Sequence, residues 1–340
     1  MRFALPFLRR NTLASFVLAS TLAAFAPAVL ADDSAKPVER NPIFPGQKAD
    51  PEVLYSQKTG RVYVYPTSEA NGFRVFSTDN LVDWKDEGLV LTDADVSWET
   101  RAYWAPSIIE KKIDGKFKYF FYFCANEKIG VAVGDDPTGP FVDKGSVLID
   151  RSLRPEGRNG VEIDPYVFAD PVSGKNYLYW GNSYLCVCEL NDDMTSLKLE
   201  TKRDITPPDF FEGTYVFYRN GKYYLTWSKH DTRSVEYQVR VATSDSPLGP
   251  FVAPEKDHIV LYKVPEKEIY GPGHHSFLFL PNGDNYVFYH RLCLPLGKNP
   301  WARETCLDRM YFNEDGSIKP IVPTREGISQ PVDLKQFQAK

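Results

Sequence analysis

Hydrophobic and polar positions alternate along this chain in short runs that end at turn signals. The runs are rich in Tyr, Phe and Val, and pairs such as Asp114-Gly115, Asn220-Gly221 and Asn282-Gly283 separate them. Alternation with a period of two predicts half-buried strands, and these pairs predict tight turns between antiparallel strands. No helical period longer than a turn or two interrupts the pattern. The sequence therefore predicts an all-β fold.

One outline of strand, turn and aromatic-rich strand occurs five times, beginning with ADPEVLYSQKTGRVYVY from Ala49 to Tyr65. The aligned first positions are 50, 105, 164, 212 and 274, so the spacings are 55, 59, 48 and 62 residues. A second half also repeats, as DDPTGPF and SDSPLGPF show. Repeats of this length are typical of propeller blades. We predict a five-bladed β-propeller with four-stranded antiparallel blades around a central channel.

The aligned position of the repeat carries acidic residues in three of the five copies: Asp50, Asp164 and Glu212, beside Ala105 and His274. Proline follows this position three times, as expected at the start of an innermost strand whose edge is unpaired. Proline also favours an extended conformation in the residue before it, which would fix where Asp50 and Asp164 point. We expect the three acids to converge at one mouth of the channel.

Paired carboxyl groups on either side of a bond are what glycoside hydrolysis requires, one as a protonated acid and one as an ionised base or nucleophile. A third carboxylate nearby can raise the pKa of the acid by repulsion. A single Asp-Pro or Glu-Gly pair is common in turns and would be read as structural. Three acids at one position of a repeat favour a catalytic interpretation.

The motifs ADPEV, YWAPS, IDPYVF, FEGTYVFYRNGKYYLTWS and YGPGHHSF, in this order and spacing, resemble glycoside hydrolase family 43 over roughly residues 41–323. The resemblance implies a five-bladed propeller that cleaves glycans containing arabinose, xylose or galactose with inversion. It also implies roles for the matched residues: Asp50 as general base, Glu212 as general acid, and Asp164 as the group that orients the acid and modulates its pKa.

Further site residues come from the same resemblance. Trp104 matches a sugar platform, Arg291 a substrate-contacting arginine and His274 a channel histidine; a core tryptophan, a surface charge and a core histidine are the structural alternatives. Some members hold a metal ion near that histidine through water, so the resemblance admits a calcium or sodium ion in the channel, although no cofactor is required. His275 should point away from the site. Glu52 and Glu162 could replace the assigned acids if the register slips.

The expected function is that of an exo-acting α-L-arabinofuranosidase that removes terminal furanose or pentose residues from an oligo- or polysaccharide. A β-galactofuranosidase and a β-xylosidase are alternatives in the same class, and an endo-acting arabinanase is a weaker one. A non-catalytic carbohydrate-binding propeller is the alternative from another class. The net charge of −5 gives no electrostatic reason to expect nucleic acid or an anionic membrane as a partner.

The first residues have the pattern of a secretory signal. Arg2, Arg9 and Arg10 precede an apolar run that ends in small residues near Ala31. We therefore expect a signal peptide at residues 1–31, a polar lead-in at 32–40 and a single catalytic propeller at 41–340, exported to the periplasm or outside the cell. A membrane anchor is disfavoured because the apolar run is short for a span.

Five cysteines leave at least one unpaired in a monomer. Cys293 and Cys306 flank a loop between two expected strands and could form a disulfide across it. Alternatively, all five are small buried hydrophobic residues.

Overall fold

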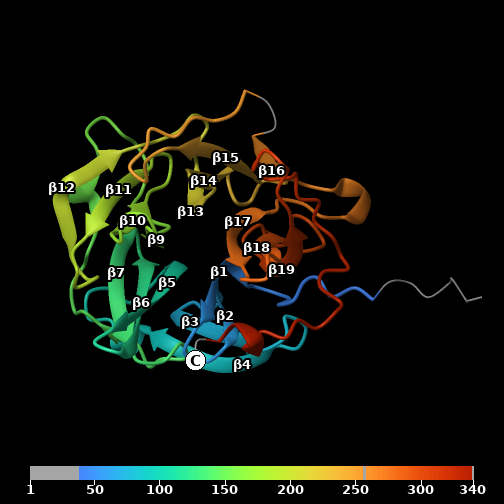
Figure 1. The fold of residues 1–340 in the computed structure, drawn as a ribbon, viewed down its shortest axis with the longest axis horizontal. Helices are drawn as coiled ribbons and strands as arrows, with labels where there is room; N and C mark the ends of the chain where they lie inside the picture. Colours follow the sequence, from blue (N-terminus) through green and yellow to red (C-terminus); the bar gives the residue numbers. More distant parts are fainter. Residues whose placement is uncertain (1–37, 256–257, 339–340) are drawn as a thin grey trace, which may run out of the picture. The chain divides into compact units, whose positions relative to one another are not determined.

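In the computed structural model, which describes residues 38–255 and 258–338, the chain forms five antiparallel sheets arranged as the blades of a propeller (Figure 1). The first blade comprises β1 (Ala49–Ser56), β2 (Arg61–Thr67), β3 (Gly72–Thr78) and β4 (Lys85–Thr92). The second comprises β5 (Tyr103–Ile113), β6 (Lys116–Ala125), β7 (Lys128–Gly134) and β8 (Val142–Asp143). The third comprises β9 (Tyr166–Ala169), β10 (Asn176–Trp180), β11 (Cys186–Leu190) and β12 (Leu197–Asp204).

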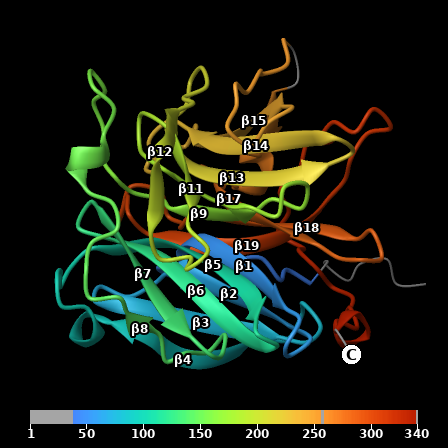
Figure 2. The same ribbon diagram turned by 60° about the vertical axis from the view of Figure 1, so that its left-hand side comes forward.

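The fourth blade comprises β13 (Glu212–Arg219), β14 (Lys222–Lys229), β15 (Gln238–Ser244) and β16 (Ile259–Leu261). The fifth comprises β17 (Gly273–Phe279), β18 (Asn285–Leu292) and β19 (Arg303–Met310). Short 3₁₀ turns lie between or after the strands: η1 (Asp93–Asp95), η2 (Arg151–Leu153), η3 (Pro265–Lys267) and η4 (Lys335–Phe337). The first strand of each blade lies innermost, where β1 contacts both β5 and β17 (Figure 2). The sequence prediction of a five-bladed all-β propeller is confirmed.

The fifth blade differs from the predicted four-stranded form. Its sheet has three strands among the described residues, and the chain segment that precedes β1 lies along the free edge of β19. Phe44 forms an isolated antiparallel bridge with Thr305, and the Lys48 backbone N–H donates to the Arg303 carbonyl at 2.8 Å. The segment that precedes the first blade therefore closes the ring by pairing with the last blade.

The side chain of Asn41 anchors this closing segment. It is 3% exposed; its Nδ2 donates to the carbonyl oxygens of Leu307 at 3.1 Å and Thr324 at 3.0 Å. Its Oδ1 accepts from the Leu307 N–H at 2.8 Å. One buried amide thus satisfies several backbone groups that would otherwise lose their hydration without a partner.

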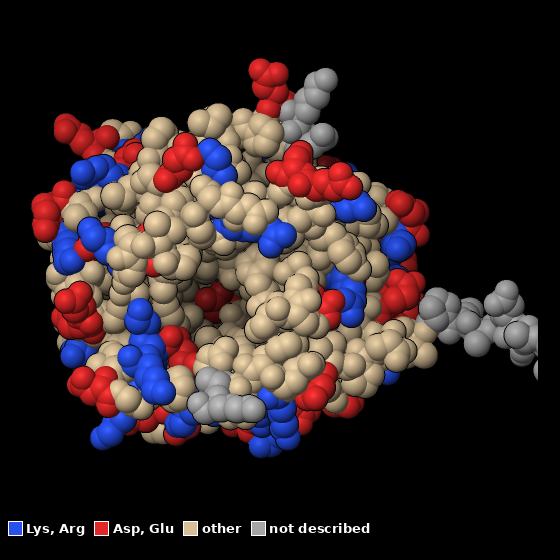
Figure 3. Space-filling view, viewed as in Figure 1, with Lys and Arg blue, Asp and Glu red and all other residues tan. Residues whose placement is uncertain are grey.

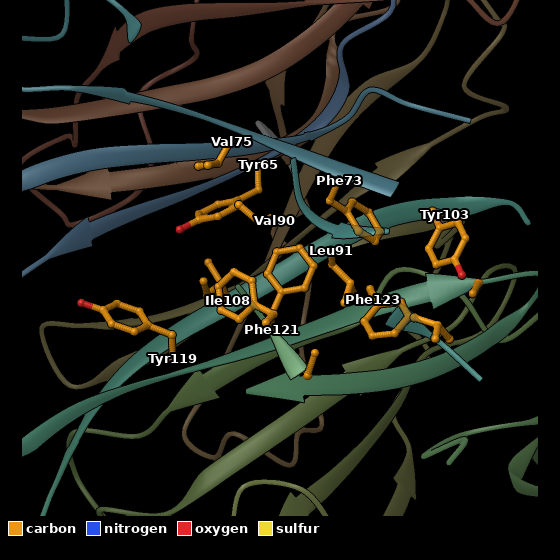
Figure 4. Close-up of a cluster of buried hydrophobic side chains, with 14 of the residues drawn as sticks. Tyr65, Phe73, Val75, Val90, Leu91, Tyr103, Ile108, Tyr119, Phe121 and Phe123 are labelled. Carbon is orange, nitrogen blue, oxygen red and sulfur yellow. The ribbon is translucent and has the colours of Figure 1, made fainter. Parts of the chain in front are cut away.

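The hydrophobic core consists of five clusters, each packed between two neighbouring blades. Figure 4 shows the cluster between the first and second blades, where aromatic rings of β2, β3, β5 and β6 meet. Phe121 lies 5.2 Å from Phe73 and 4.9 Å from Phe141 between ring centroids. The fifth cluster, with Val62 and Phe288, joins the last blade to the first. The abundance of Phe and Tyr follows from this design, because large rings fill the wedge between twisted sheets.

Two further sequence expectations concern the cysteines and the first residues of the chain. All five cysteines are free thiols, so the disulfide between Cys293 and Cys306 is absent; Cys306 is buried, and the Cys293 thiol lies 3.5 Å from the Gly46 carbonyl instead. The predicted signal peptide lies outside the described residues and stays a prediction. Within the described ranges, no helix is long and apolar enough to cross a membrane.

We predict that Asn41→Ala lowers the free energy of unfolding by about 1–3 kcal/mol, because buried groups of Leu307 and Thr324 lose their partner. Urea unfolding followed by tryptophan fluorescence measures this change. Asn71→Ala is the matched control, since Asn71 is exposed and makes one long contact of 3.5 Å with Asp93. Equal stabilities for the two variants would show that the segment does not contribute to ring closure.

Candidate active site

A cavity of about 690 Å³ opens where the innermost strands begin. Its walls include all three predicted acids together with two tryptophans, a histidine, an arginine and an asparagine: Asp50, Asp164, Glu212, Trp104, Trp301, His274, Arg303 and Asn182. The face in Figure 3 is hollowed near the centre of the ring, and atoms of Asp or Glu are visible in its depth. The sequence prediction that the three acids converge is therefore confirmed by the structure.

The backbone positions the acids by a distortion at the start of each inner strand. One residue there has a left-handed conformation in every blade, with φ of 49° at Asp50, 42° at Ala105, 57° at Asp164, 64° at Gly213 and 42° at His274. In four blades a β-bulge accompanies it. The expectation that proline holds Asp50 and Asp164 extended was wrong. Both residues adopt the left-handed conformation instead, at a cost on the order of 1 kcal/mol for a residue with a side chain, and at Asp50 a bulge accompanies it.

The observed strand pairing changes which residues of the repeats are equivalent. Glu212 pairs with Ser228 before the bulge, as Ala49 pairs with Thr67, so Gly213 is the residue equivalent to Asp50. Glu212 therefore lies one position earlier than the sequence alignment placed it. It still reaches the cavity, because the extra residue of a bulge re-aims the side chains beside it.

Cationic and imidazole groups surround the carboxylate of Asp50. Its Oδ1 lies 3.2 Å from Arg303 Nη1, 3.2 Å from His274 Nδ1 and 3.1 Å from His290 Nδ1. Burial alone would raise the pKa of Asp50, but His274, Arg303 and His290 together hold it well below its usual range. Among the described residues none donates to Oδ2, so this oxygen of an ionised carboxylate is available to a water molecule.

Neutral donors surround Glu212 instead. Its Oε1 accepts from the Tyr237 hydroxyl and its Oε2 from Asn182 Nδ2, both at 2.8 Å. Burial raises the pKa of Glu212 to about 7, with a further contribution from the charge of Asp50, although Tyr237 and Asn182 oppose the shift. Glu212 is thus suited to carry a proton near neutral pH.

Asp164 lies between these two groups. Its Oδ2 accepts from the Gly213 N–H at 3.0 Å and lies 3.8 Å from His274 Nδ1. Burial and the charges of Glu212 and Asp50 raise its pKa well above the usual range. Because it binds the residue that follows Glu212, Asp164 fixes the backbone on which that acid stands.

His274 and His275 face opposite ways, as the sequence predicted. His274 lines the cavity beside Asp50, and burial lowers its pKa. His275 is 3% exposed, with Nε2 at 2.7 Å from Thr226 Oγ1 on the other side of the strand.

The groups around His274 bear on the channel ion that the resemblance admits. Single ligand atoms of Asp164, Glu212 and His274 lie within 4.8 Å of one another. Both oxygens of Glu212 already accept hydrogen bonds, and His274 Nδ1 faces Asp50. A cation here would also oppose protonation of Glu212. These residues fit a proton-transfer site better than a resident cation.

Of the two remaining residues that were expected to contact substrate, one lines the cavity and the other does not. Trp104 lines the cavity and is 41% exposed, as a sugar platform requires. Arg291 does not reach the cavity: it is 4% exposed, and its Nε donates to Glu304 at 2.8 Å. Strand alternation explains the error, because His290 faces Asp50 and its neighbour must face away. The arginine in the cavity is Arg303, on the adjacent strand β19.

Several site residues were not identified from the sequence: Asn182, Thr232, Tyr237, His290, Trp301 and Arg303. All except His290 and Arg303 lie in connections between strands, and no short motif marks them. His290 could have been found, since it precedes Arg291 on a strand that was already identified. The other five depend on how loops of three blades meet in space.

The two alternative acids have structural roles. Glu52 accepts from Ser107 Oγ at 3.0 Å and the Ile108 N–H at 3.3 Å, and burial raises its pKa to about 8. Glu162 is 1% exposed and ion-paired with Arg154 at 2.7 Å, so it is not a rim residue. Neither is among the residues that line the cavity.

Comparison with known proteins identifies the family. The model of "Glycosyl hydrolases family 43" matches residues 39–318. The beta-D-galactofuranosidase xynD of Aspergillus niger is 34% identical over 92% of this chain and 94% of its own length. An arabinoxylan arabinofuranohydrolase of Paenibacillus polymyxa is 27% identical over 96% of this chain, which spans 59% of that relative.

A solved structure agrees. The Bacillus subtilis arabinoxylan arabinofuranohydrolase, in complex with cellotetraose, superimposes with a TM-score of 0.71 at 26% identity, covering 86% of this chain and 69% of that chain. The family match over most of the chain, the five-bladed fold and the arrangement of the carboxyl groups lead to one conclusion. This chain belongs to glycosyl hydrolases family 43 and is a glycosidase.

Proposed function

We propose that this glycosidase is an exported, exo-acting enzyme that removes terminal furanose or pentose residues, α-L-arabinofuranose first among them, from plant or microbial polysaccharides with inversion. The opposite pKa shifts of Asp50 and Glu212 in one cavity are the observation that carries the mechanism. Groups whose environments move their pKa values apart are suited to serve as base and acid in one reaction. The basic and apolar pattern of the first residues supports export.

The proposed reaction is a single displacement. Asp50 accepts a proton from a water molecule as the water oxygen attacks the anomeric carbon. Glu212 donates its proton to the glycosidic oxygen while the bond between that oxygen and the anomeric carbon breaks. The attack comes from the face opposite the leaving group, so the configuration inverts. Asp164 holds Glu212 through the Gly213 N–H and repels charge on it.

A β-D-galactofuranosidase is the second candidate, because the Aspergillus niger relative of that name aligns over nearly the whole of both chains. A β-xylosidase is a further alternative within the family. A panel of 4-nitrophenyl α-L-arabinofuranoside, β-D-galactofuranoside and β-D-xylopyranoside separates the three. A kcat/KM that is highest on the galactofuranoside would replace arabinofuranose as the proposed sugar.

Replacing either member of the acid–base pair should abolish most activity. We expect Asp50→Asn and Glu212→Gln each to lower kcat about 100-fold or more on an unactivated glycan, the loss typical of acid–base groups. The Glu212 variant should recover in part on substrates whose leaving group needs no protonation. Asp209→Asn is the control, since Asp209 lies outside the cavity and pairs with Lys229 at 2.9 Å. Near wild-type turnover in either test variant, with a normal fold by circular dichroism, would show that the replaced residue is not the base or the acid.

The pH profile of kcat/KM should fall on the alkaline side as Glu212 loses its proton, near its pKa of about 7. Asp164 and Glu212 repel each other when both are ionised, which opposes the loss of the last proton from the pair. Asp164→Asn removes this repulsion, so the pKa of Glu212 should fall and the alkaline limb should move to lower pH. Kinetics across pH 4–9 on a substrate with a good leaving group measure the shift. An unchanged limb with a reduced rate would leave Asp164 as an orienting group only.

The first sugar released should have the opposite anomeric configuration from the substrate. Proton NMR spectra recorded early in the reaction, before mutarotation, distinguish the two anomers. Early accumulation of the retained anomer would mean that one carboxylate acts as a nucleophile, contrary to the proposed single displacement.

A further inference from the structure

His290, on β18, is a buried histidine beside the active site to which the proposed reaction assigns no role. Its side chain is 0% exposed, and burial lowers its pKa to about 4, so the imidazole is neutral near pH 7. A neutral imidazole has one N–H donor and one acceptor nitrogen. Both nitrogens of this ring have partners in the site.

One nitrogen of the ring contacts both the main chain and the carboxylate of the base. Nδ1 of His290 lies 3.2 Å from the backbone nitrogen of Asp50 and 3.1 Å from its Oδ1. Nδ1 accepts from the N–H in one tautomer and donates to Oδ1 in the other, and an ionised carboxylate favours the second. Because Asp50 has a left-handed backbone, with φ of 49°, these contacts stabilise a conformation that few residues adopt without such support.

The other nitrogen of the ring completes a closed circuit of four groups. Nε2 lies 3.1 Å from Thr232 Oγ1, which accepts from Arg303 Nη1 at 2.9 Å. The same Nη1 donates to Asp50 Oδ1 at 3.2 Å. The four groups come from β1, β18, β19 and the connection between β14 and β15. The circuit therefore fixes the carboxylate of Asp50 from two directions, through Arg303 and through His290.

The face of the imidazole supports the partner of the acid. The rings of His290 and Tyr237 are stacked, with 4° between their planes and 5.4 Å between their centroids. Tyr237 is buried, and its hydroxyl donates to Glu212 Oε1 at 2.8 Å. Stacking against a flat ring restricts the orientation of the phenol and hence of its hydroxyl. One imidazole thus contacts the base with its edge and the partner of the acid with its face.

The titratable groups that face His290 come from each element packed against it. They are Asp50 on β1, His274 on β17 with 6.0 Å between the two imidazole centroids, Arg303 on β19 and Tyr237. Burial, Arg303 and His274 oppose a positive charge on the imidazole, and they outweigh Asp50, which favours one. His290 therefore acts through its position and its hydrogen bonds near neutral pH.

We propose that His290 is a positioning residue shared by the base and the acid: its Nδ1 edge holds Asp50, and its ring face holds Tyr237 against Glu212. This inference rests on the proposed roles of Asp50 and Glu212 and adds the residue that couples their positions. Asp50 begins the first blade and Glu212 the fourth, and β17 of the fifth blade contacts the inner strands of both. A residue of the fifth blade thus sets the gap between the two carboxyl groups, on which inversion depends.

His290→Phe tests the contact with the base, because it keeps a ring for Tyr237 but loses both nitrogens. The substrates are the 4-nitrophenyl and methyl glycosides of the sugar that the wild type cleaves best. On both, kcat should fall about 10- to 100-fold, because attack by water needs a well-placed base with either leaving group. The acidic limb of the kcat/KM profile should move to higher pH, because His290 helps to lower the pKa of Asp50.

His290→Asn tests the stacking contact, because it keeps a polar group near Asp50 but removes the ring. The loss in kcat/KM should be about tenfold on the methyl glycoside and within about threefold on the 4-nitrophenyl glycoside, whose leaving group needs little protonation. The Tyr237 hydroxyl lowers the pKa of Glu212, so a displaced phenol should move the alkaline limb to higher pH. Tyr237→Phe keeps the ring without the hydroxyl and should reproduce this alkaline shift.

His275→Asn is the matched control, because His275 is buried on the neighbouring strand β17 and does not line the cavity. Neither limb should move in this variant. If His290→Phe and His290→Asn, both folded by circular dichroism, have the same effect on both glycosides and both limbs, His290 only fills the core and the inference is overturned. An acidic limb that moves to lower pH in His290→Phe would also overturn it, because protonation of His290 would then set that limb.

The two acid–base variants distinguish failure of this inference from failure of the proposed function. If Asp50→Asn and Glu212→Gln keep near wild-type turnover, the proposed roles and the shared positioning residue fail together. If both lose turnover as expected while the two His290 variants behave alike, only the inference about His290 fails.

Discussion

The burial of three carboxyl groups around one channel mouth is the constraint on which this site depends. Removing a carboxylate from water raises its pKa, and each further negative charge in the same cavity raises it more. The three carboxyl groups do not share this effect equally, because different groups contact each of them. Arg303 and two imidazoles contact Asp50, whereas a phenol and an amide contact Glu212. One acid is therefore kept ionised and the other protonated at the same pH.

A left-handed residue at the start of each inner strand, with a β-bulge in four of the five blades, converts a structural repeat into this asymmetric site. Every blade has one left-handed residue there, but the blades place different side chains on it, from Asp50 and His274 to the glycine at position 213. The Gly213 N–H is free to donate to Asp164 because the bulge removes it from the ladder with β14. The same distortion thus supplies a side chain in some blades and a backbone donor in another.

The sequence was sufficient to predict the repeats, the all-β fold and the convergence of the acids, because these depend on local alternation and on turn residues. It was not sufficient for the residues that set the pKa values. Arg291 was assigned to the substrate by resemblance, although alternation along β18 points it away from the cavity, and Arg303 was not considered. The shift of Glu212 by one position went unnoticed because a bulge adds a residue without any mark in the pattern. Asn182, Thr232 and Trp301 lie in connections whose paths depend on packing between blades.

Closure of the ring and the position of the base Asp50 depend on the same residue, Arg303. The segment that begins at Asn41 pairs with β19, and its last contact joins the Lys48 N–H to the Arg303 carbonyl. Two residues later, Asp50 accepts a hydrogen bond from the side chain of that same arginine. Main chain and side chain of Arg303 therefore position the first strand and the ionised acid together. Because Arg303 also holds Trp301, a change in ring closure would reach the base and the aromatic wall before it disturbed Glu212, whose partners come from the third and fourth blades.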